Sequence, residues 1–386
     1  MPEARPTVVF IGHVARLSGG EIALLRLVSA MTVHVNAYVI LGEDGPLVER
    51  LRERGATVEV LAMDPQVREI RKDTVTPGGL RLRALPALIG YVWRLRQRLR
   101  QIRPDLVHTN TLKAALYGGT AARLAGLPVV WHVRDRIADD YLPRPAVWLV
   151  RLLARVIPTA VVVNSRATLE TVPSAAHATV LYNPIVPDAV ERPRGSAHRS
   201  TAGLTIGVLG RLAPWKGQHV FLDAFASEFK GEPVRAHVIG SAMFGEDAYA
   251  AGLVEQAERL GVVDQIDFRG FVEDVWAELD ELDVLVHCSI TPEPFGQVVL
   301  EGMAAGLPVV AAGVGGPAEI INDDVDGMLV EPGNAAVLAV ALRRLADDEA
   351  LRERLGKAAL ERAREYSPER TAERLLSVYD EVLARR

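Results

Sequence analysis

Residues 284–311 read VLVHCSITPEPFGQVVLEGMAAGLPVVA and decide the fold class. Two short β-branched runs, 284–287 and 309–311, flank a segment of helical character at 298–305. A strand, a helix and a second strand in succession predict a parallel pair of strands, because parallel neighbours need a crossover connection. Polar and charged residues fill the stretch after the first strand, which is where ligands bind in open α/β sheets.

The same alternation runs through the whole chain. Strands are predicted in the first half at 7–11, 36–41, 58–61, 106–108, 129–133, 160–164 and 179–181, and in the second half at 205–209, 235–239, 265–268, 284–287, 309–311 and 328–330. Helices are predicted between them at 21–30, 46–54, 114–124, 218–226, 248–260, 298–305 and 335–346, with a last helical region at 349–386. This order predicts an α/β protein whose doubly wound parallel sheets are covered by helices on both faces.

A chain of 386 residues is too long for one ordinary core and indicates two domains. The alternation pauses in a stretch that is rich in proline and glycine and lacks periodicity, 183–203. We therefore predict an N-terminal Rossmann-like domain at 1–185, completed by the C-terminal helix 368–386, a linker at 186–203, and a C-terminal Rossmann-like domain at 204–367. The alternative is a long surface loop inside one domain.

The composition is that of a folded protein, with 49% apolar and 24% charged residues and a net charge of −5. That charge argues against nucleic acid as a partner. Cys288 is the single cysteine, so no internal disulfide can form, which is typical of a reducing compartment. The start of the chain lacks a secretory signal, and no apolar run approaches 18 residues. We expect a cytoplasmic protein.

Two loops that follow strands and open helices contain candidate phosphate ligands. In 210–217, Arg211 can donate to two phosphate oxygens and Lys216 adds a second positive charge. Cations fixed there would stabilise a diphosphate leaving group as its charge grows. Gly19 and Gly20 open the first helix and would let backbone N–H groups approach a phosphate. The alternatives are solvated basic residues and a plain turn.

Glu293 and Glu301 stand eight residues apart, before and within a helix. Eight residues exceed two helical turns, so the two carboxylates would bracket a ligand end to end. Carboxylates accept hydrogen bonds from the paired hydroxyls of a sugar or a ribose. Free N–H groups near Phe295 and Gly296 would meet a phosphate or a sugar oxygen.

The stretch Glu293-Pro-Phe-Gly…Glu301-Gly-Met-Ala-Ala-Gly-Leu-Pro-Val-Val-Ala resembles the E-x7-E signature of the family 4 retaining glycosyltransferases. That family has the GT-B fold, with two Rossmann-like domains facing across a cleft. The resemblance extends to Gly19-Gly20-Glu21, His108, His132, Asn164-Ser165, Gly210-Arg211, Lys216-Gly217, Gly270, Ser289 and Gly315-Gly316-Pro317-Ala318-Glu319. Three departures, Cys288-Ser289, Gly302 and Asn183-Pro184-Ile185, bear on the subgroup and the sugar and not on the fold.

The resemblance implies a role for each matching position. Arg211 and Lys216 would hold the donor diphosphate and Glu301 the ribose hydroxyls. Glu293, with the backbone of Phe295 and Gly296, would contact the transferred sugar. The remaining implied contacts are Gly19 and Gly20 at the phosphate, His132 over the sugar near the reacting carbon, and the backbone of Phe271 and Val272 at the base. His13, His108 and Asn110 follow or end strands of the first half and are candidates for the acceptor side. For the three histidines the alternative is a hydrogen-bonded histidine at a strand end without a ligand. The co-substrate would be a nucleotide-sugar, with UDP before GDP, and no cofactor would be permanently bound.

A retaining transferase of this family is thought to use front-face attack, in which the leaving diphosphate takes the acceptor's proton. The catalytic residues would then be Arg211, Lys216, Glu293 and His132, with His132 orienting or stabilising the sugar more than acting as a base. We predict no metal site. The D-x-D sequence 324–326 lies before Gly327, where a turn explains it.

Other functions compete with this one. A nucleotide-sugar 2-epimerase or a phosphorylase would share the fold and the nucleotide or phosphate site. Residues 313–318 fit the G-x-G-x-x-A of a dinucleotide oxidoreductase, although Pro317-Ala318-Glu319 matches the transferase. The stretch 81–103 holds seven arginines and no acid around Trp93, and 148–155 is similar. Such segments can lie on an anionic membrane, giving peripheral contact on its inner face or a non-catalytic binding protein. The alternative is an ordinary helix with its arginines in water.

Overall fold

The computed structural model describes residues 5–65, 84–139, 141–173, 178–185, 203–243 and 245–385. The chain forms two compact units, one of Met1–Pro184 with Pro368–Arg386 and the other of Ile185–Ser367. Apart from Gly203, the predicted linker 186–203 lies outside the described residues, as do Arg81 and Arg83 of the basic stretch. The linker therefore stays a prediction.

The first unit is built on a parallel sheet whose described strands run in the order β3-β2-β1-β4-β5-β6-β7. Its elements are β1 (Thr7–Gly12), α1 (Gly19–Met31), β2 (Asn36–Leu41), α2 (Pro46–Glu53), β3 (Thr57–Val60), α4 (Ala84–Ile102), β4 (Leu106–Thr109), α5 (Leu112–Leu124), β5 (Val129–Val133), α6 (Arg144–Leu153), β6 (Ala160–Val163), α7 (Arg166–Leu169), β7 (Ala178–Val180) and α16 (Pro368–Ala384). The strand order reverses between β1 and β4, so the carboxyl ends of these strands border the switch point where ligands bind.

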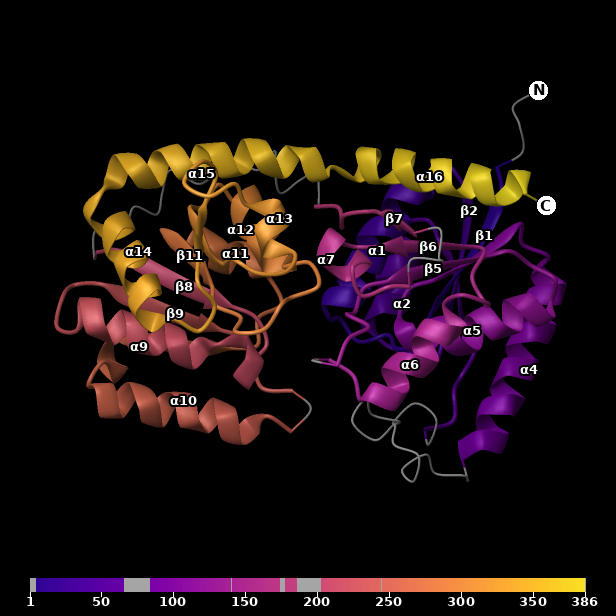
Figure 1. The fold of residues 1–386 in the computed structure, drawn as a ribbon, viewed down its shortest axis with the longest axis horizontal. Helices are drawn as coiled ribbons and strands as arrows, with labels where there is room; N and C mark the ends of the chain where they lie inside the picture. Colours follow the sequence, from indigo (N-terminus) through magenta and orange to yellow (C-terminus); the bar gives the residue numbers. More distant parts are fainter. Residues whose placement is uncertain are drawn as a thin grey trace. The chain divides into compact units, whose positions relative to one another are not determined.

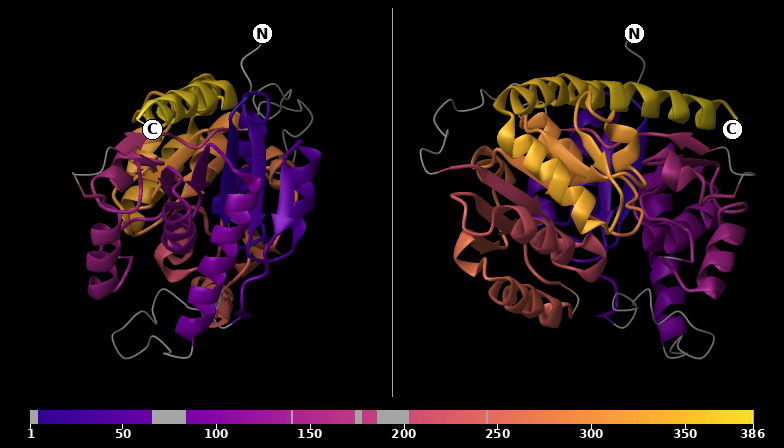
Figure 2. Two further views of the ribbon diagram at one scale, coloured as in Figure 1. Left: turned by 90° about the vertical axis from the view of Figure 1, so that its right-hand side faces the viewer. Right: turned by 60° about the vertical axis from the view of Figure 1, so that its left-hand side comes forward.

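Helices cover both faces of this sheet because alternate strand residues are apolar on each side. Val9 and Ile11 of β1 belong to the core under α4, α5 and α6, whereas Val8 and Phe10 belong to the core under α1, α2 and α16. The C-terminal helix α16 therefore completes the first unit and lies beside α1 (Figures 1 and 2). It brings Tyr379, which is buried, to the sheet.

The second unit has a parallel sheet in the order β10-β9-β8-β11-β12-β13, which is the Rossmann strand order. Its elements are β8 (Thr205–Leu209), η2 (Pro214–Lys216), α9 (Gln218–Phe229), β9 (Arg235–Ile239), α10 (Asp247–Leu260), η3 (Val263–Gln265), β10 (Ile266–Gly270), α11 (Val275–Asp280), β11 (Val284–His287), α12 (Gln297–Ala304), β12 (Val309–Ala312), α13 (Pro317–Ile320), β13 (Met328–Val330), α14 (Ala335–Asp347), α15 (Glu349–Ala363) and η4 (Arg364–Tyr366). Val284 and Val286 pack with α9 and α14, and Leu285 lies under Gly302 of α12 on the other face.

The predicted α/β class is confirmed, and most predicted strands agree with the observed ones to within a residue at each end. The last helical region, predicted at 349–386, contains α15, η4 and α16, and α16 begins at Pro368, the residue at which the C-terminal helix was predicted to start. Proline at 368 lacks the N–H that would continue α15, and it suits the first turn of a new helix.

Candidate active site

The loop after β8 brings two cations to one aromatic ring in the second unit. The guanidinium carbon of Arg211 lies 5.7 Å, and the Lys216 ammonium 4.5 Å, from the centre of the Trp215 ring. Arg211 is also paired with Glu246, with 3.2 Å between Nε and Oε2. The two predicted phosphate ligands therefore lie together at the carboxyl edge of the sheet.

Gly217 fixes this loop against the end of β11. Its φ of 73° lies in the left-handed region, and a Cβ added there would be 2.0 Å from the carbonyl oxygen of Cys288. The amide of Ile290 donates to the carbonyl of Trp215 at 2.9 Å, which ties the two loops together. Only glycine allows both the backbone angle and the close approach. As a result, Lys216 reaches residues that follow β11.

Glu293 is the centre of a buried polar cluster. The Lys216 ammonium lies 2.5 Å from its Oε1, and its Oε2 accepts from the Ser289 hydroxyl at 3.0 Å and contacts Nε2 of His287. Burial alone would raise the pKa of Glu293, but the charges of Lys216 and His287 and their hydrogen bonds hold that pKa well below its usual range. Glu293 is therefore an ionised acceptor in a fixed position.

Two glycines hold the backbone that carries Glu293. Gly316 donates its N–H to the Glu293 carbonyl at 2.8 Å, and a Cβ on Gly316 would lie 2.2 Å from the carbonyl oxygen of Phe295. Gly296 then caps α12 with a φ of 88°. Glu301 lies on α12 and is 7% exposed. Of the two predicted carboxylates, Glu293 therefore precedes α12 and Glu301 lies within it.

Phe271 and Val272 follow β10 at the same edge of the sheet. Gly210 donates to Ile239 at 2.9 Å and Gly240 donates to Gly270 at 2.8 Å, so the ends of β8, β9 and β10 are aligned. Phe271 is 66% exposed. The exposed Phe271 ring therefore follows the same sheet edge as the loop that carries Arg211 and Lys216.

The first unit gathers a second group of predicted residues at the carboxyl ends of β1, β4 and β5. The side-chain amide of Asn110 donates to the carbonyl of Gly20 at 3.1 Å and accepts from Nε of Arg134 at 2.8 Å. His132 contacts the same guanidinium, with 3.3 Å between Nδ1 and Nη2. His13 pairs with the hydroxyl of Thr111, which caps α5, at 3.0 Å. Gly19 and Gly20 have open space where a Cβ would lie.

Several residues of these clusters were not selected from the sequence as ligands. Arg134 is buried, and burial lowers its pKa to about 9 although Glu21 and Asp135 act in the opposite direction. Its guanidinium joins Asn110, Asn183 and His132. His287 joins the Glu293 cluster, and Tyr379 reaches His108 from α16. His287 and Arg134 lie at or just beyond strand ends, which is the signal that could have identified them.

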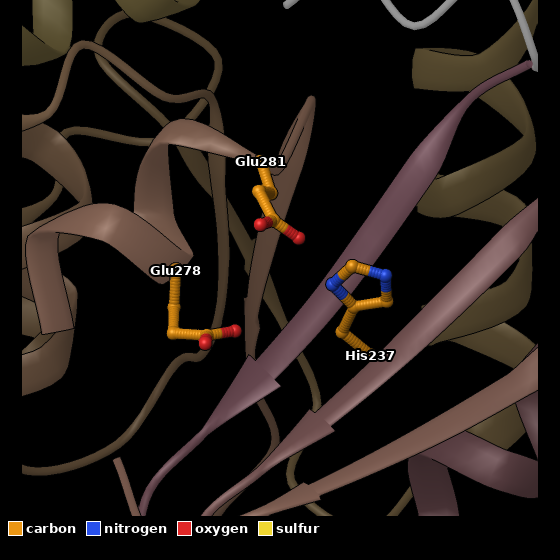
Figure 3. Close-up of side chains that lie close together, drawn as sticks. All are labelled: His237, Glu278 and Glu281. Carbon is orange, nitrogen blue, oxygen red and sulfur yellow. The ribbon is translucent and has the colours of Figure 1, made fainter. Parts of the chain in front are cut away.

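A third polar cluster lies elsewhere in the second unit, where β9 meets α11 (Figure 3). His237, Glu278 and Glu281 have ligand atoms within 4.8 Å of one another. Arg269 lies among them, with its Nη2 at 2.5 Å from Glu281 and 3.4 Å from Nε2 of His237. Because a guanidinium already supplies the positive charge, we read this group as an ion-pair network and assign no metal to it.

The D-x-D sequence forms a turn before β13. Asp324 has a φ of 58°, and the Asp326 carboxylate accepts from the backbone amide of Asn322 at 2.7 Å. Asp324 pairs with Arg344 at 2.7 Å. The two carboxylates therefore serve turn geometry and a surface ion pair, which agrees with the turn predicted from the sequence.

Comparison with known proteins gives consistent results over both units. The model for glycosyl transferases group 1 matches residues 194–362, and the model for glycosyltransferase family 4 matches 47–189. A D-inositol 3-phosphate glycosyltransferase from Actinosynnema mirum is 32% identical over 71% of this chain and 72% of its own. A relative with the same name from Corynebacterium glutamicum is 33% identical, over 53% of this chain and half its own length.

Solved structures agree over nearly the full length. The Anabaena HepE structure in complex with UDP and glucose has a TM-score of 0.82 and 26% identity, over 97% of this chain and all of that one. A sucrose-phosphate synthase from Thermosynechococcus elongatus has a TM-score of 0.77 over 99% of this chain at 19% identity, which bears on the fold alone. With two Rossmann-like units and relatives matched across both, the chain belongs to the family 4 glycosyltransferases and has the GT-B fold.

Proposed function

We propose that this protein is a retaining glycosyltransferase that moves a sugar from a UDP-sugar to an acceptor hydroxyl. The observation that carries the proposal is the Lys216–Glu293 pair beside Arg211, with Glu301 buried on α12 just beyond it. Cations suit the diphosphate, and fixed carboxylates suit the hydroxyls of the sugar and the ribose. HepE, a structural relative with 26% identity, was solved with UDP-glucose, which favours UDP over GDP.

In this mechanism Arg211 and Lys216 stabilise the charge that develops as the bond from the sugar's anomeric carbon to the diphosphate breaks. The acceptor oxygen bonds to the same face of that carbon, and its proton passes to the leaving diphosphate. Glu293 is ionised and hydrogen-bonded, so it orients sugar hydroxyls. No side chain has to act as an obligatory base, and no metal ion has to neutralise the diphosphate.

The acceptor is proposed as a class. Relatives named D-inositol 3-phosphate glycosyltransferases support a hydroxylated acceptor such as a sugar or a polyol phosphate. A lipid-linked or surface-polysaccharide precursor is compatible with the same chemistry. His13, Asn110 and His132 of the first unit are the proposed acceptor-side and sugar-side contacts. A 2-epimerase or a phosphorylase would use the same nucleotide or phosphate site without a separate acceptor, and product analysis separates them.

Peripheral membrane contact is a further part of the proposal. None of the described helices is long and apolar enough to cross a bilayer. Two helices on one face of the first unit nevertheless expose apolar side chains, Ile89 and Trp93 on α4 and Trp148 on α6, with exposed fractions of 60%, 52% and 68%. Neither helix contains an acidic residue. A cationic surface with protruding tryptophans suits an anionic bilayer.

The donor site is tested by thermal unfolding with UDP, GDP, ADP and UDP-glucose in buffer without metal. A nucleotide at 100 times its dissociation constant stabilises the folded state by about 2.7 kcal/mol, which raises the melting temperature by several degrees. We expect this shift with UDP in the wild type and its loss in Glu301→Gln. Glu361→Gln, which alters an exposed glutamate of α15, should retain the full shift. Equal stabilisation of wild type and Glu301→Gln would contradict the assignment.

A further inference from the structure

His132 has a buried ring nitrogen that the fold leaves without a partner. The residue lies near the carboxyl end of β5 and is 2% exposed. Among the described residues, no atom makes a hydrogen bond to its Nε2. A buried polar atom left unpaired costs about 1–3 kcal/mol, so it calls for an explanation.

The other ring nitrogen of His132 ends a chain of hydrogen bonds that begins on the C-terminal helix. The hydroxyl of Tyr379 on α16 lies 2.7 Å from Nδ1 of His108 on β4. Nε2 of His108 lies 3.2 Å from Nδ1 of His132. Nη2 of Arg134 approaches the same Nδ1 at 3.3 Å. Tyr379, His108, His132 and Arg134, which form this series of hydrogen bonds, all belong to the first unit.

Arg134 sets the direction of these bonds. A guanidinium can only donate, so Nδ1 of His132 must carry a lone pair. Burial, followed by the charge of Arg134, lowers the pKa of His132 well below its usual value and that of His108 to about 3. Both rings are therefore neutral. The proton of His132 must then reside on Nε2, the atom without a partner.

The same logic fixes His108 and Tyr379. Because Nδ1 of His132 accepts, Nε2 of His108 must be the N–H that donates to it. Nδ1 of His108 then has a lone pair and accepts from the Tyr379 hydroxyl. Burial raises the pKa of Tyr379 well above its usual value, which keeps the hydroxyl proton in place. Every donor along the chain meets an acceptor until the free Nε2–H of His132.

We propose that Tyr379 and His108 are positioning residues that hold His132 as its Nε2–H tautomer, so that the first unit presents a hydrogen-bond donor to an oxygen of the sugar substrate. The inference rests on the proposed function for the identity of that ligand. It gives His132 the role of a donor and excludes that of a general base, since Nε2, the nitrogen without a partner in the fold, carries the proton and has no lone pair. It also makes α16 part of the catalytic arrangement of the first unit.

Removing the Tyr379 hydroxyl should weaken the preference of His132 for the Nε2–H tautomer. In Tyr379→Phe, Nδ1 of His108 is left without a donor, so His108 can shift its proton to Nδ1 and present a lone pair to His132. Only the 3.3 Å contact with Arg134 then favours a lone pair on Nδ1 of His132. We expect this single long contact to be broken in part of the population, which gives an Nδ1–H tautomer whose Nε2 is an acceptor. Turnover should fall about tenfold, since a hydrogen bond strengthened in the transition state is lost. UDP affinity, which depends on the second unit, should stay within a factor of two of the wild-type value.

The decisive measurement is long-range ¹H–¹⁵N NMR of protein labelled at histidine, with the His132 signals assigned by His132→Gln. Tyr91→Phe is the matched control, because Tyr91 is equally buried in the first unit and its hydroxyl has no partner among the described residues. We expect Nε2–H for His132 in wild type and Tyr91→Phe, and a mixture of tautomers in Tyr379→Phe. An Nδ1–H tautomer in the wild type would overturn the proposal, whether or not Tyr379→Phe folds.

Activity provides the second arm of the experiment. With UDP-glucose as the probe, a Tyr379→Phe enzyme with wild-type turnover and unchanged tautomers would also overturn the proposal. Failure of the proposed function looks different. In that case the wild type would neither bind UDP nor turn over UDP-glucose, while the tautomer of His132 would still be readable by NMR.

Discussion

At the scale of single residues, Gly217 connects the backbone of the β8–α9 loop to the Lys216–Glu293 pair. We expect Gly217→Ala to destabilise the protein by about 1–3 kcal/mol, because alanine is strained at a φ of 73° and its Cβ would lie 2.0 Å from the Cys288 carbonyl oxygen. Relief of that contact must move the loop away from β11, which displaces Lys216. UDP affinity should fall about tenfold, measured by calorimetry beside a thermal melt.

Gly252→Ala is the control for this substitution. Gly252 lies inside α10 with open space around the position of a Cβ, so alanine there should stabilise the helix by up to about 1 kcal/mol. Its UDP affinity should equal that of the wild type. If Gly217→Ala binds UDP as tightly as Gly252→Ala does, the close approach to Cys288 does not position Lys216.

Arg211, Lys216 and Glu293 were predicted from the sequence because each carries a charge in a loop that follows a strand. Their pairing was not, because Lys216 and Glu293 are 77 residues apart and meet only through the parallel register of β8 and β11. Tyr379 is 271 residues from His108, and helical periodicity could mark it only as a buried position of α16.

At the scale of elements, α4 and α6 each pack one side against the sheet and expose apolar side chains on the other. Tyr91, Leu95 and Leu99 of α4 are fully buried against the sheet, whereas Ile89 and Trp93 face outward. α5 lies between α4 and α6 on the same face (Figure 1).

We expect the wild type to float with vesicles of mixed phosphatidylcholine and phosphatidylglycerol, and added salt to weaken that binding. The double variant Trp93→Ser, Trp148→Ser should remain with the buffer.

Val340→Ser serves as the matched substitution in the flotation assay, because Val340 is 67% exposed on α14 of the second unit. It should float as the wild type does. Wild-type protein that stays in the buffer with these mixed vesicles would remove the membrane contact from the proposed function. The fold assignment and the donor site would be unaffected by that result.

Sequence patterns located the elements well because each strand here is a short β-branched run with clear punctuation. They were less informative about the ends and joins of elements. In the region 349–386, the helical pattern continues through η4, and the C-terminal helix predicted from 368 begins there as α16. A periodic pattern records which side of a helix is buried, whereas the tighter turn of η4 depends on tertiary contacts.

At the scale of the whole molecule, two units with the same doubly wound strand order divide the work by chemistry. In the proposed function, the second unit would supply the cations and carboxylates for the nucleotide-sugar. The first unit would supply the hydrogen-bonded series Tyr379, His108 and His132, which ends in a donor. Front-face transfer and a double displacement through a covalent carboxylate intermediate both retain the anomeric configuration, whereas a single attack from the opposite face inverts it.

The anomeric configuration of the released sugar tests the proposed retaining mechanism. With UDP-α-glucose alone, slow transfer to water should release glucose whose first-formed anomer is α, observable by proton NMR before mutarotation mixes the anomers. Release of the β anomer first would require attack from the opposite face and would contradict the retaining mechanism.

The same reaction after treatment with EDTA should keep at least half its rate, because in the proposed mechanism Arg211 and Lys216 supply the charge that a metal would otherwise provide. A rate abolished by EDTA and restored by magnesium or manganese would instead mean that the two cations are insufficient for the departing diphosphate.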